Sequence, residues 1–135
     1  MKHKIYKLLD ELNYGTDQKL VSGDLNAYVE KITERSKIVS IQHNNELHGF
    51  ISYYDNDKTS KIAFLTMLAI NKDFQHLGYG LGLLNFSISN LKRLKFKTYC
   101  LEVLKDNEIA VSLYKKFGFI VIKEDSIHYY MEKEL

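Results

Sequence analysis

Two glycines in the segment QHLGYG, residues 75–80, have the spacing most suggestive of chemistry. The segment follows an apolar run typical of a strand and precedes apolar residues that recur at helical spacing. At a helix start, backbone N–H groups lack carbonyl partners and the helix dipole adds partial positive charge. Because Gly78 and Gly80 allow a ligand to approach the backbone closely, we expect the segment to hold a phosphate. A tight turn and helix cap without a ligand is the alternative.

Two other phosphate-binding loops do not fit this spacing. The nucleotide triphosphate loop needs Lys followed by Ser or Thr after its last glycine, where this chain has Leu81 and Gly82. The dinucleotide fingerprint GxGxxG needs a glycine at the position of Leu83. The spacing therefore favours a shorter phosphate-binding loop.

Composition limits what else the chain can be. Its 135 residues are 45% hydrophobic and 27% charged, so we expect one folded domain over residues 1–135. The 19 basic and 17 acidic residues nearly balance, which argues against nucleic acid as a partner. The first residues carry no long apolar run, so we expect no membrane anchor and a cytoplasmic location. Cys100 is the single cysteine, and no residue pattern indicates a metal site.

Local patterns predict the elements that must position the glycine segment. Apolar residues at helical spacing predict one helix over 4–12 and a second that Asp24 caps, with Leu25, Tyr28, Val29 and Ile32 on one side. Strands are predicted over 38–41 and 47–54, around the turn HNNE, and over 62–70, where the run suits a strand covered on both faces.

The second half of the chain repeats this alternation of helix and strand. The helix after the glycine segment carries Leu81, Leu84, Ile88 and Leu91, and a later helix carries Ile109, Leu113 and Phe117. Strands are predicted over 98–103, 119–122 and 127–131. The order ααβββαβαββ predicts an α+β fold in which helices flank a mixed, mostly antiparallel central sheet.

A second segment, LEVLKDNEIAVSLYKKFGFI at residues 101–120, accompanies the glycine segment in the expected order. With Asn107, Ala110, Tyr114 and Phe117-Gly118-Phe119 it resembles the second conserved segment of the GCN5-related N-acetyltransferases (GNAT family). QHLGYG is similar to the same family's signature of Gln or Arg, two residues, Gly, any residue, and Gly or Ala. The resemblance covers about residues 37–133. The family usually opens with an additional strand, and none is evident here.

The resemblance implies that acetyl-CoA is the cosubstrate. It places the pyrophosphate on the backbone amides of His76, Leu77, Gly78, Tyr79, Gly80 and Leu81, with Gln75 at the loop entrance. His76 stands where the family more often has arginine, so this site has less positive charge. The preceding strand is expected to bulge near residues 67–69, to pair pantetheine along Leu68, Ala69 and Ile70, and to offer the Leu68 N–H to the thioester oxygen. Asn107 is expected to contact the pantetheine arm, and a helix N-cap alone is its alternative.

The same resemblance implies two catalytic residues. An amine acceptor with a pKa of about 10 must lose a proton before it attacks a thioester, so a base or a water relay is needed. Glu102, in the LEV sequence, is our candidate base, and its alternative is a polar residue at a strand end. Tyr114 is our candidate acid for the departing thiolate, and its alternative is structural. It follows Asn107 by two helical turns, which predicts that both project on the same side.

Other residues carry weaker signals. Nothing near Cys100 in the sequence supplies a group that would activate its thiol as a nucleophile. His43 and His48 flank the first hairpin turn and are interpreted as solvated, with a position facing the acceptor cleft as their alternative, while His3 and His128 have no partner pattern. The ten Tyr and seven Phe are interpreted mostly as core and sheet packing, although four tyrosines could line an acceptor pocket or the surface of a homodimer: Tyr53, Tyr54, Tyr129 and Tyr130.

The function implied by the resemblance is direct transfer of an acetyl group from acetyl-CoA to a primary amine of a small molecule, such as an amino sugar or metabolite. Three alternatives remain open at this point. They are acetylation of a peptide or protein amino group, a non-catalytic coenzyme A-binding module, and a protein-interaction domain without coenzyme.

Overall fold

Two helices open the computed structural model, which describes residues 1–14, 21 and 23–135. α1 spans Lys2–Tyr14 and α2 spans Leu25–Arg35. Apolar side chains at helical spacing are buried along both, as the sequence predicts: Ile5, Leu8, Leu9, Leu12, Val29 and Ile32. Asp24 caps α2, because its Oδ1 accepts a hydrogen bond of 3.2 Å from the N–H of Ala27.

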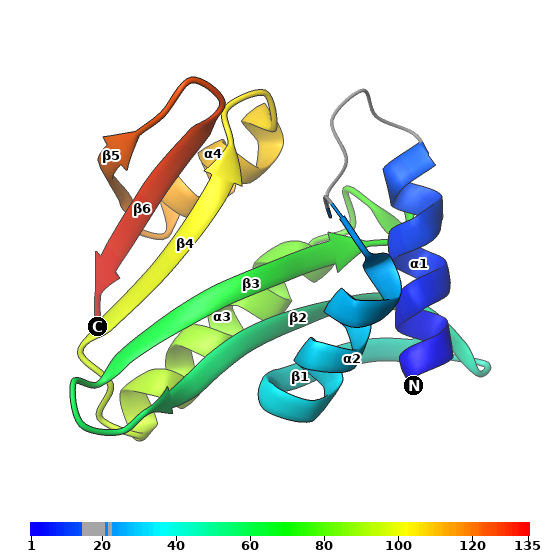
Figure 1. Cartoon of the computed structure of the whole chain (residues 1–135), viewed down its shortest axis with the longest axis horizontal. Coiled ribbons are helices and arrows are strands. Elements are labelled where there is room, and N and C mark those ends of the chain that lie inside the picture. The colour runs from blue at the N-terminus through cyan, green and yellow to red at the C-terminus, as the bar shows by residue number, and fades with distance from the viewer. Residues whose placement is uncertain (15–20, 22) are drawn as a thin grey trace. The chain divides into compact units, whose positions relative to one another are not determined.

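Six strands follow, interrupted by helices in the predicted order (Figure 1). The strands are β1 (Lys37–His43), β2 (Glu46–Asp57), β3 (Ile62–Ile70), β4 (Thr98–Leu104), β5 (Ile120–Glu124) and β6 (His128–Glu134). Between them lie the short 3-10 helix η1 (Lys72–Phe74), α3 (Tyr79–Arg93) and α4 (Glu108–Lys116). The sheet order is β1-β2-β3-β4-β6-β5. The predicted α+β fold with the order ααβββαβαββ is therefore confirmed, and η1 is its one addition among the described residues.

Contacts group the chain into two compact units. Unit 1 comprises residues 1–52 and 67–84, and unit 2 comprises residues 53–66 and 85–135. β2, β3 and α3 contribute residues to both units.

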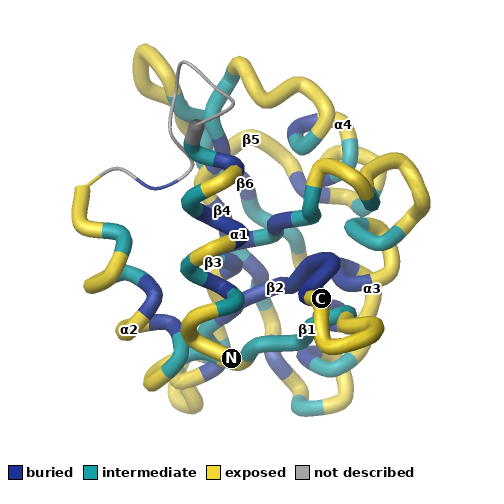
Figure 2. Tube along the Cα trace, turned by 90° about the vertical axis from the view of Figure 1, so that its right-hand side faces the viewer, coloured by how far each residue is buried: buried dark blue, intermediate teal, exposed yellow. Residues whose placement is uncertain are grey.

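The core of unit 1 forms where the two opening helices meet the strands. α1 packs beside α2, and α2 packs beside β1 (Figure 1). Leu47 and Phe50 of β2 and Met67 and Ala69 of β3 join the apolar side chains of the helices in one buried cluster. The dark segment of β2 in Figure 2 marks this burial. Asn44 and Asn45 both have positive φ, 49° and 63°, which suits the tight predicted turn between β1 and β2.

Unit 2 is built on a parallel pair and two antiparallel pairs of strands. β3 pairs with β4 in parallel from Ile62↔Thr98 to Leu65↔Leu101. β4 pairs antiparallel with β6 along its whole length, and β6 pairs antiparallel with β5. An aromatic chain forms much of the core, with ring centroids 5.6–6.2 Å apart between successive members: Tyr53, Tyr99, Phe119 and Tyr114.

Several predicted details are wrong. Ile109 is 71% exposed, and the residues that α4 buries are Val111 and Tyr114, on a different side of the helix. Leu81 is 41% exposed because it lies in the first turn of α3. β3 alternates between buried and more exposed side chains, so its first half is covered on one face only. Tyr53 is fully buried, which agrees with the interpretation of core packing and excludes a place on the surface.

Candidate functional site

The glycine loop, residues 75–81, joins η1 to the first turn of α3. Gly78 adopts φ +86° and immediately precedes α3, whose first backbone bond runs from the N–H of Gly82 to the oxygen of Gly78 at 3.0 Å. The N–H groups of Tyr79, Gly80 and Leu81 therefore lack partners within the helix. Gly80 lies inside the helix and not before it, which corrects the predicted boundary. This geometry suits an anion at the helix start.

Two further features of the loop fit a phosphate group. A Cβ added at Gly78 would meet nothing within 4 Å, so space lies open above the backbone there. The first turn of α3 contains no acidic side chain that would compete for the N–H groups. His76, with φ 64°, is a second residue of the loop in the left-handed region. The open space at Gly78 and the absence of an acidic side chain in the first turn of α3 leave room for an anion at the helix start.

The entrance of the loop is fixed to β3 and η1. The side-chain amide of Gln75 donates a 3.0 Å hydrogen bond to the oxygen of Ile70. Asn71 caps η1, because its Oδ1 accepts a 3.0 Å hydrogen bond from the N–H of Asp73. The N–H of Asn71 in turn donates to the oxygen of His48 at 2.8 Å. Gln75 thus lies at the loop entrance, as predicted, and its side chain contacts the end of β3 there.

The ring of His48 lies beside the residue that precedes the glycine loop and beside one residue within it, a feature that the sequence did not reveal. Its ring stacks on Phe74 of η1 at a centroid distance of 3.5 Å and lies nearly parallel to Tyr79 of α3 at 6.2 Å. Only 6% of His48 is exposed, so the interpretation of a solvated histidine is wrong for it and holds for the exposed His43. Within the described part of the chain, its buried Nδ1 has no hydrogen-bond partner.

The end of β3 contains the residues expected to pair with pantetheine. Ala69 is buried in the unit 1 core, whereas Leu68 and Ile70 are half-buried on the other side of the strand. Gly49 lies against this segment, and a Cβ there would approach the Ile70 side chain to 2.6 Å and the Ala69 oxygen to 3.0 Å. The expected bulge near residues 67–69 stays a prediction.

In unit 2, Tyr114 is held by the turn that ends α4. The N–H of Gly118 bonds to the oxygen of Lys115 and the N–H of Phe119 to the oxygen of Tyr114, each at 3.0 Å. This is a Schellman motif, and Gly118 has the φ of +94° that it requires. The rings of Tyr114 and Phe119 meet at 5.7 Å. The FGF sequence therefore fixes the Tyr114 ring.

The environment of Tyr114 keeps its hydroxyl neutral. The residue is 5% exposed, and burial raises the pKa of its phenol well above the ordinary value. Asn107 is the exposed N-cap of α4, and its Oδ1 accepts from the N–H of Ala110 at 3.2 Å. The N-cap role of Asn107 is thus confirmed, and its contact with the pantetheine arm stays a prediction. Because one residue is a cap and the other lies in the core, they differ in exposure despite their helical spacing.

Glu102 lies on the more exposed face of β4, opposite Leu101 and Val103, which are both buried. Cys100 shares this face, and its Sγ lies 4.0 Å from Oε2 of Glu132. Burial raises the pKa of the Cys100 thiol, and the negative charge of Glu132 raises it further by a smaller amount. Because a nucleophilic cysteine needs the opposite environment, Cys100 is unsuited to carry an acetyl group.

The structure surrounds Glu102 with three residues that the sequence did not associate with it. The strand register places Glu102 beside Tyr130, and Nε2 of His128 lies 3.3 Å from the Glu102 carboxylate. Asp125 lies 3.3 Å from Nδ1 of the same histidine, and the Tyr130 hydroxyl donates to Asp125 at 3.0 Å. We call Glu102, Asp125, His128 and Tyr130 the histidine cluster. Its members come from β4 and from the β5–β6 hairpin, so only strand pairing reveals it.

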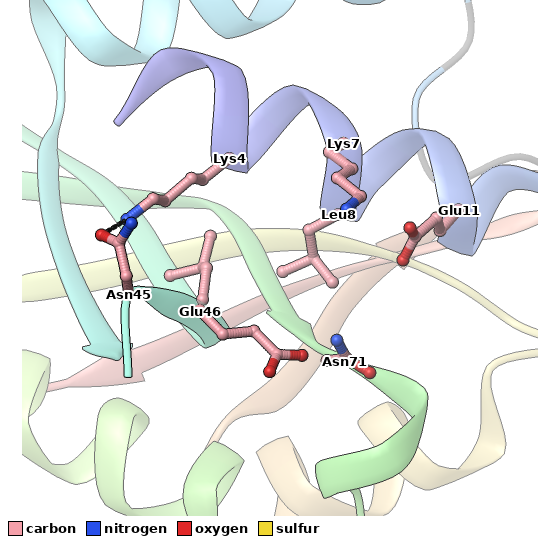
Figure 3. Close-up of a pocket in the computed structure, with 8 residues that line it drawn as sticks. Lys4, Lys7, Leu8, Glu11, Asn45, Glu46 and Asn71 are labelled. Atoms are coloured by element: carbon pink, nitrogen blue, oxygen red, sulfur yellow. Dashed lines mark hydrogen bonds between the residues drawn. The ribbon is translucent and has the colours of Figure 1, made fainter. Parts of the chain in front are cut away.

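A cavity of about 180 Å³ opens beside α1 in unit 1 (Figure 3). Its walls carry two basic and two acidic side chains, two amides and two leucines: Lys4, Lys7, Glu11, Glu46, Asn45, Asn71, Leu8 and Leu47. Lys4 donates to Oδ1 of Asn45 at 2.7 Å and to Oε1 of Gln42 at 3.2 Å. Opposite charges balance along its walls, so charge alone selects no class of ligand.

The described residues contain neither a membrane-spanning helix nor a cluster of metal ligands. No helix there is both long and apolar enough to cross a membrane. No group of three or more His, Cys, Asp or Glu side chains in the same part of the chain is arranged to hold a metal ion.

Comparison with known proteins gives concordant matches. Residues 2–119 match the profile of the Acetyltransferase (GNAT) family. The chain is 32% identical over 89 residues to the spermine/spermidine N(1)-acetyltransferase of Bacillus subtilis (strain 168). That match covers 62% of this chain and 59% of the relative, so it spans less than two thirds of the curated protein.

Solved structures share the fold. The ribosomal-protein-S18-alanine N-acetyltransferase from Escherichia coli superimposes with a TM-score of 0.80 at 19% identity, over 98% of this chain and 86% of that one. The PaiA N-acetyltransferase from Thermoplasma acidophilum, solved in complex with coenzyme A, gives a TM-score of 0.78 at 18% identity, over 99% and 92% of the two chains. With the family profile matching most of its length, this chain belongs to the GNAT family of acetyltransferases.

Proposed function

We propose that this chain transfers an acetyl group from acetyl-CoA to a primary amine of a small molecule. The observation that carries the proposal is the glycine loop, where Gly78 turns the chain into α3 and leaves the first N–H groups of the helix without partners. Family membership supports the same donor. Acetyl-CoA would supply an acetyl group activated as a thioester.

The proposed binding residues follow from this donor. The amides of residues 76–81 would hold the pyrophosphate, and Gln75 would keep the loop attached to β3 through its bond to Ile70. The edge of β3 at Leu68, Ala69 and Ile70 would pair with the pantetheine arm, with the Leu68 N–H directed at the carbonyl oxygen. Asn107 would add a contact to that arm.

Two side chains would manage the protons of the reaction. Glu102, exposed on β4, would take a proton from the acceptor ammonium so that the amine lone pair can attack. Tyr114 would give its hydroxyl proton to the leaving sulfur. Burial raises the pKa of its phenol and keeps the group protonated, so Tyr114 would donate its proton as the C–S bond breaks and not to a free thiolate. As the amide forms, the nitrogen loses its second proton, which would restore the Tyr114 hydroxyl. The proton taken by Glu102 would pass to water, so that the products are the amide, the coenzyme A thiol and one released proton.

A polyamine is the first acceptor to test, because the curated Bacillus subtilis relative is named for spermine and spermidine. Amino sugars and other metabolite amines form the second group. The similarity to a ribosomal-protein acetyltransferase concerns the fold alone, and peptide amino termini form the third group.

Calorimetry and mass spectrometry test the proposal in sequence. Titration with coenzyme A is expected to show one saturable site, and incubation with acetyl-CoA is expected to add 42 Da, about one acetyl group, to an amine from one of the three groups. Glu102→Gln is expected to lower kcat by about 10² at pH 7 with unchanged coenzyme affinity. Glu132→Gln, which changes a carboxylate beside Cys100, is the matched control. Binding of coenzyme without transfer to any acceptor would instead support a non-catalytic module.

A further inference from the structure

His128 lies between two carboxylates that belong to different segments of unit 2. Its Nε2 is 3.3 Å from Oε1 of Glu102 on β4, and its Nδ1 is 3.3 Å from both oxygens of Asp125 in the β5–β6 turn. The His128 side chain is 25% exposed, and that of Glu102 is 40% exposed. Both ring nitrogens therefore face acceptors, while water can reach the cluster.

Asp125 is held in place independently of His128's ring. Its Oδ1 accepts hydrogen bonds from the N–H groups of Ile127 at 2.9 Å and His128 at 2.7 Å, and its Oδ2 accepts the Tyr130 hydroxyl at 3.0 Å. These donors, the Ile127 N–H first, lower the pKa of Asp125 to about 2. Asp125 is thus a fixed, ionised acceptor across the pH range in which proteins function.

A fixed carboxylate at Nδ1 favours one tautomer of a neutral imidazole. Asp125 and Glu102 both lie 3.3 Å from a ring nitrogen, but Asp125 is the one anchored by further donors. The relay proposed below requires the single ring proton of neutral His128 on Nδ1, donated to Asp125, so that the lone pair of Nε2 faces Glu102. This arrangement lets Nε2 accept a proton from the Glu102 carboxyl group. In many enzymes a second group orients the base, and a third group orients that second group.

The remaining charges around His128 leave this path open. Lys105 pairs with Glu124 at 3.0 Å, and Lys123 lies over the Tyr130 ring at 4.8 Å. The groups that the structure places within hydrogen-bonding reach of the imidazole nitrogens are the carboxylates of Glu102 and Asp125. An imidazolium formed at His128 would therefore lie between two negative charges.

We propose that His128 is a positioning and proton-relay residue that acts through Glu102. The inference rests on the proposed function, in which Glu102 takes the acceptor's proton. The N–H bond of the ammonium breaks as an O–H bond forms on Glu102. That O–H bond then breaks as an N–H bond forms at Nε2, which leaves Glu102 ionised, and the imidazolium returns one proton to water. Asp125 holds the ring throughout and keeps its charge.

The first experiment needs no acceptor. Long-range ¹H–¹⁵N spectra of the histidine rings are expected to show neutral His128 with its proton on Nδ1, and Asp125→Asn is expected to populate the other tautomer measurably. The His128→Gln variant assigns the signals. A neutral His128 with its proton on Nε2 in the unaltered protein would overturn the relay, because no lone pair would then face Glu102.

The second experiment is a double-substitution cycle with acetyl-CoA as donor and spermidine as the acceptor probe. His128→Gln is expected to lower kcat/KM at least about tenfold at pH 7 and by less at pH 9.5, where more of the acceptor is already deprotonated. Glu102→Gln combined with His128→Gln is expected to be no slower than Glu102→Gln alone. His43→Gln, which changes an exposed hairpin histidine, is the control.

The outcomes separate this inference from the proposed function. The relay would be overturned if the losses in kcat/KM of the two single variants multiplied in the double variant. It would also be overturned if His128→Gln lowered kcat/KM equally at both pH values. Neither outcome would affect the transferase assignment. A protein that binds no coenzyme A would instead contradict the proposed function, and the tautomer measurement would still decide the orientation on which the relay depends. Thermal melting of each variant detects a loss of folding, and Asp125→Asn provides a second variant that retains an acceptor for the turn.

Discussion

The glycine loop and the histidine cluster reach their geometry by different routes. The loop uses backbone N–H groups, a left-handed glycine and a helix start, all within residues 75–81. The histidine cluster uses side chains from β4 and from the β5–β6 hairpin, which are 23 to 28 positions apart in the chain and meet only because β4 and β6 pair. A local motif therefore specifies the first region, and a strand register specifies the second. A substitution that changes one backbone angle should therefore impair the loop most. A substitution that removes one protonation site should instead impair the cluster.

Gly78→Val gives the largest expected effect, because it adds strain and bulk where the backbone is meant to hold a ligand. At φ +86° a β-branched residue is strained by about 1–2 kcal/mol or more, and its side chain enters the open space above the loop. We expect the Kd for coenzyme A, measured by calorimetry, to rise at least about tenfold. Gly82→Ala is the control, since it adds a Cβ in open space on the same helix at an ordinary φ. Equal affinities in both variants would remove the loop from the binding site.

Tyr114→Phe tests a side chain whose position depends on a local motif but whose role is chemical. The variant keeps the ring contact with Phe119 and deletes only the hydroxyl. We expect kcat for acetyl transfer to fall by about tenfold or more with unchanged coenzyme affinity and stability. Tyr129→Phe, on β6, is the matched control. Unchanged turnover in Tyr114→Phe would leave the residue with a structural role only.

These two regions also show what could be read from the sequence. The loop and the FGF turn were predictable because glycine at a positive φ leaves a local signature at a fixed position, and both Gly78 and Gly118 have that geometry. His128 showed no partner pattern because its partners depend on the register Leu104↔His128 and Glu102↔Tyr130. A slip of one residue would turn these side chains to the other face, and no short sequence pattern encodes that choice.

Burial was predictable along the middle of helices and along β4. The apolar residues of α1 and α2 are buried as expected, and so are Leu101 and Val103 opposite the exposed Glu102. Ile109 and Leu81, each in the first turn of its helix, are exposed although they stand at helical spacing. His48 shows the opposite error. A histidine next to a hairpin turn suggests solvent, yet the stacking of Phe74 and Tyr79 buries it, and those residues lie more than 25 positions away.

Substitutions at His48 sharpen the comparison by testing whether the loop depends on anything outside its own sequence. His48→Ala removes the ring that stacks on Phe74 and lies parallel to Tyr79. An aromatic contact is worth about 0.5–1.5 kcal/mol, so we expect the Kd for coenzyme A to rise about threefold to tenfold. His48→Phe keeps a planar ring and removes the buried Nδ1 that lacks a partner among the described residues. Its affinity should therefore stay close to that of the unaltered chain. Equal losses in both variants would show that stacking is not the cause.

Asp125→Asn has the smallest expected effect, and its sign follows from the lowered pKa. The pKa of Asp125 is about 2 in the folded chain, below the ordinary 3.8, so its charge adds stability above pH 3.8 and this contribution is lost as the pH falls through 2. Asparagine retains an oxygen that accepts the N–H groups of Ile127 and His128 but carries no charge. Thermal melts at pH 7, 4, 3 and 2 should therefore show a slightly lower Tm for the variant at pH 7 and converging values near pH 2. A Tm difference that persists undiminished at pH 2 would mean that the turn, and not the charge held beside His128, accounts for the contribution of Asp125. The charge of the Asp125 carboxylate, which orients the His128 ring, would then not be anchored independently of that ring. Without this anchoring, the histidine cluster could not be distinguished from a chance contact between strands.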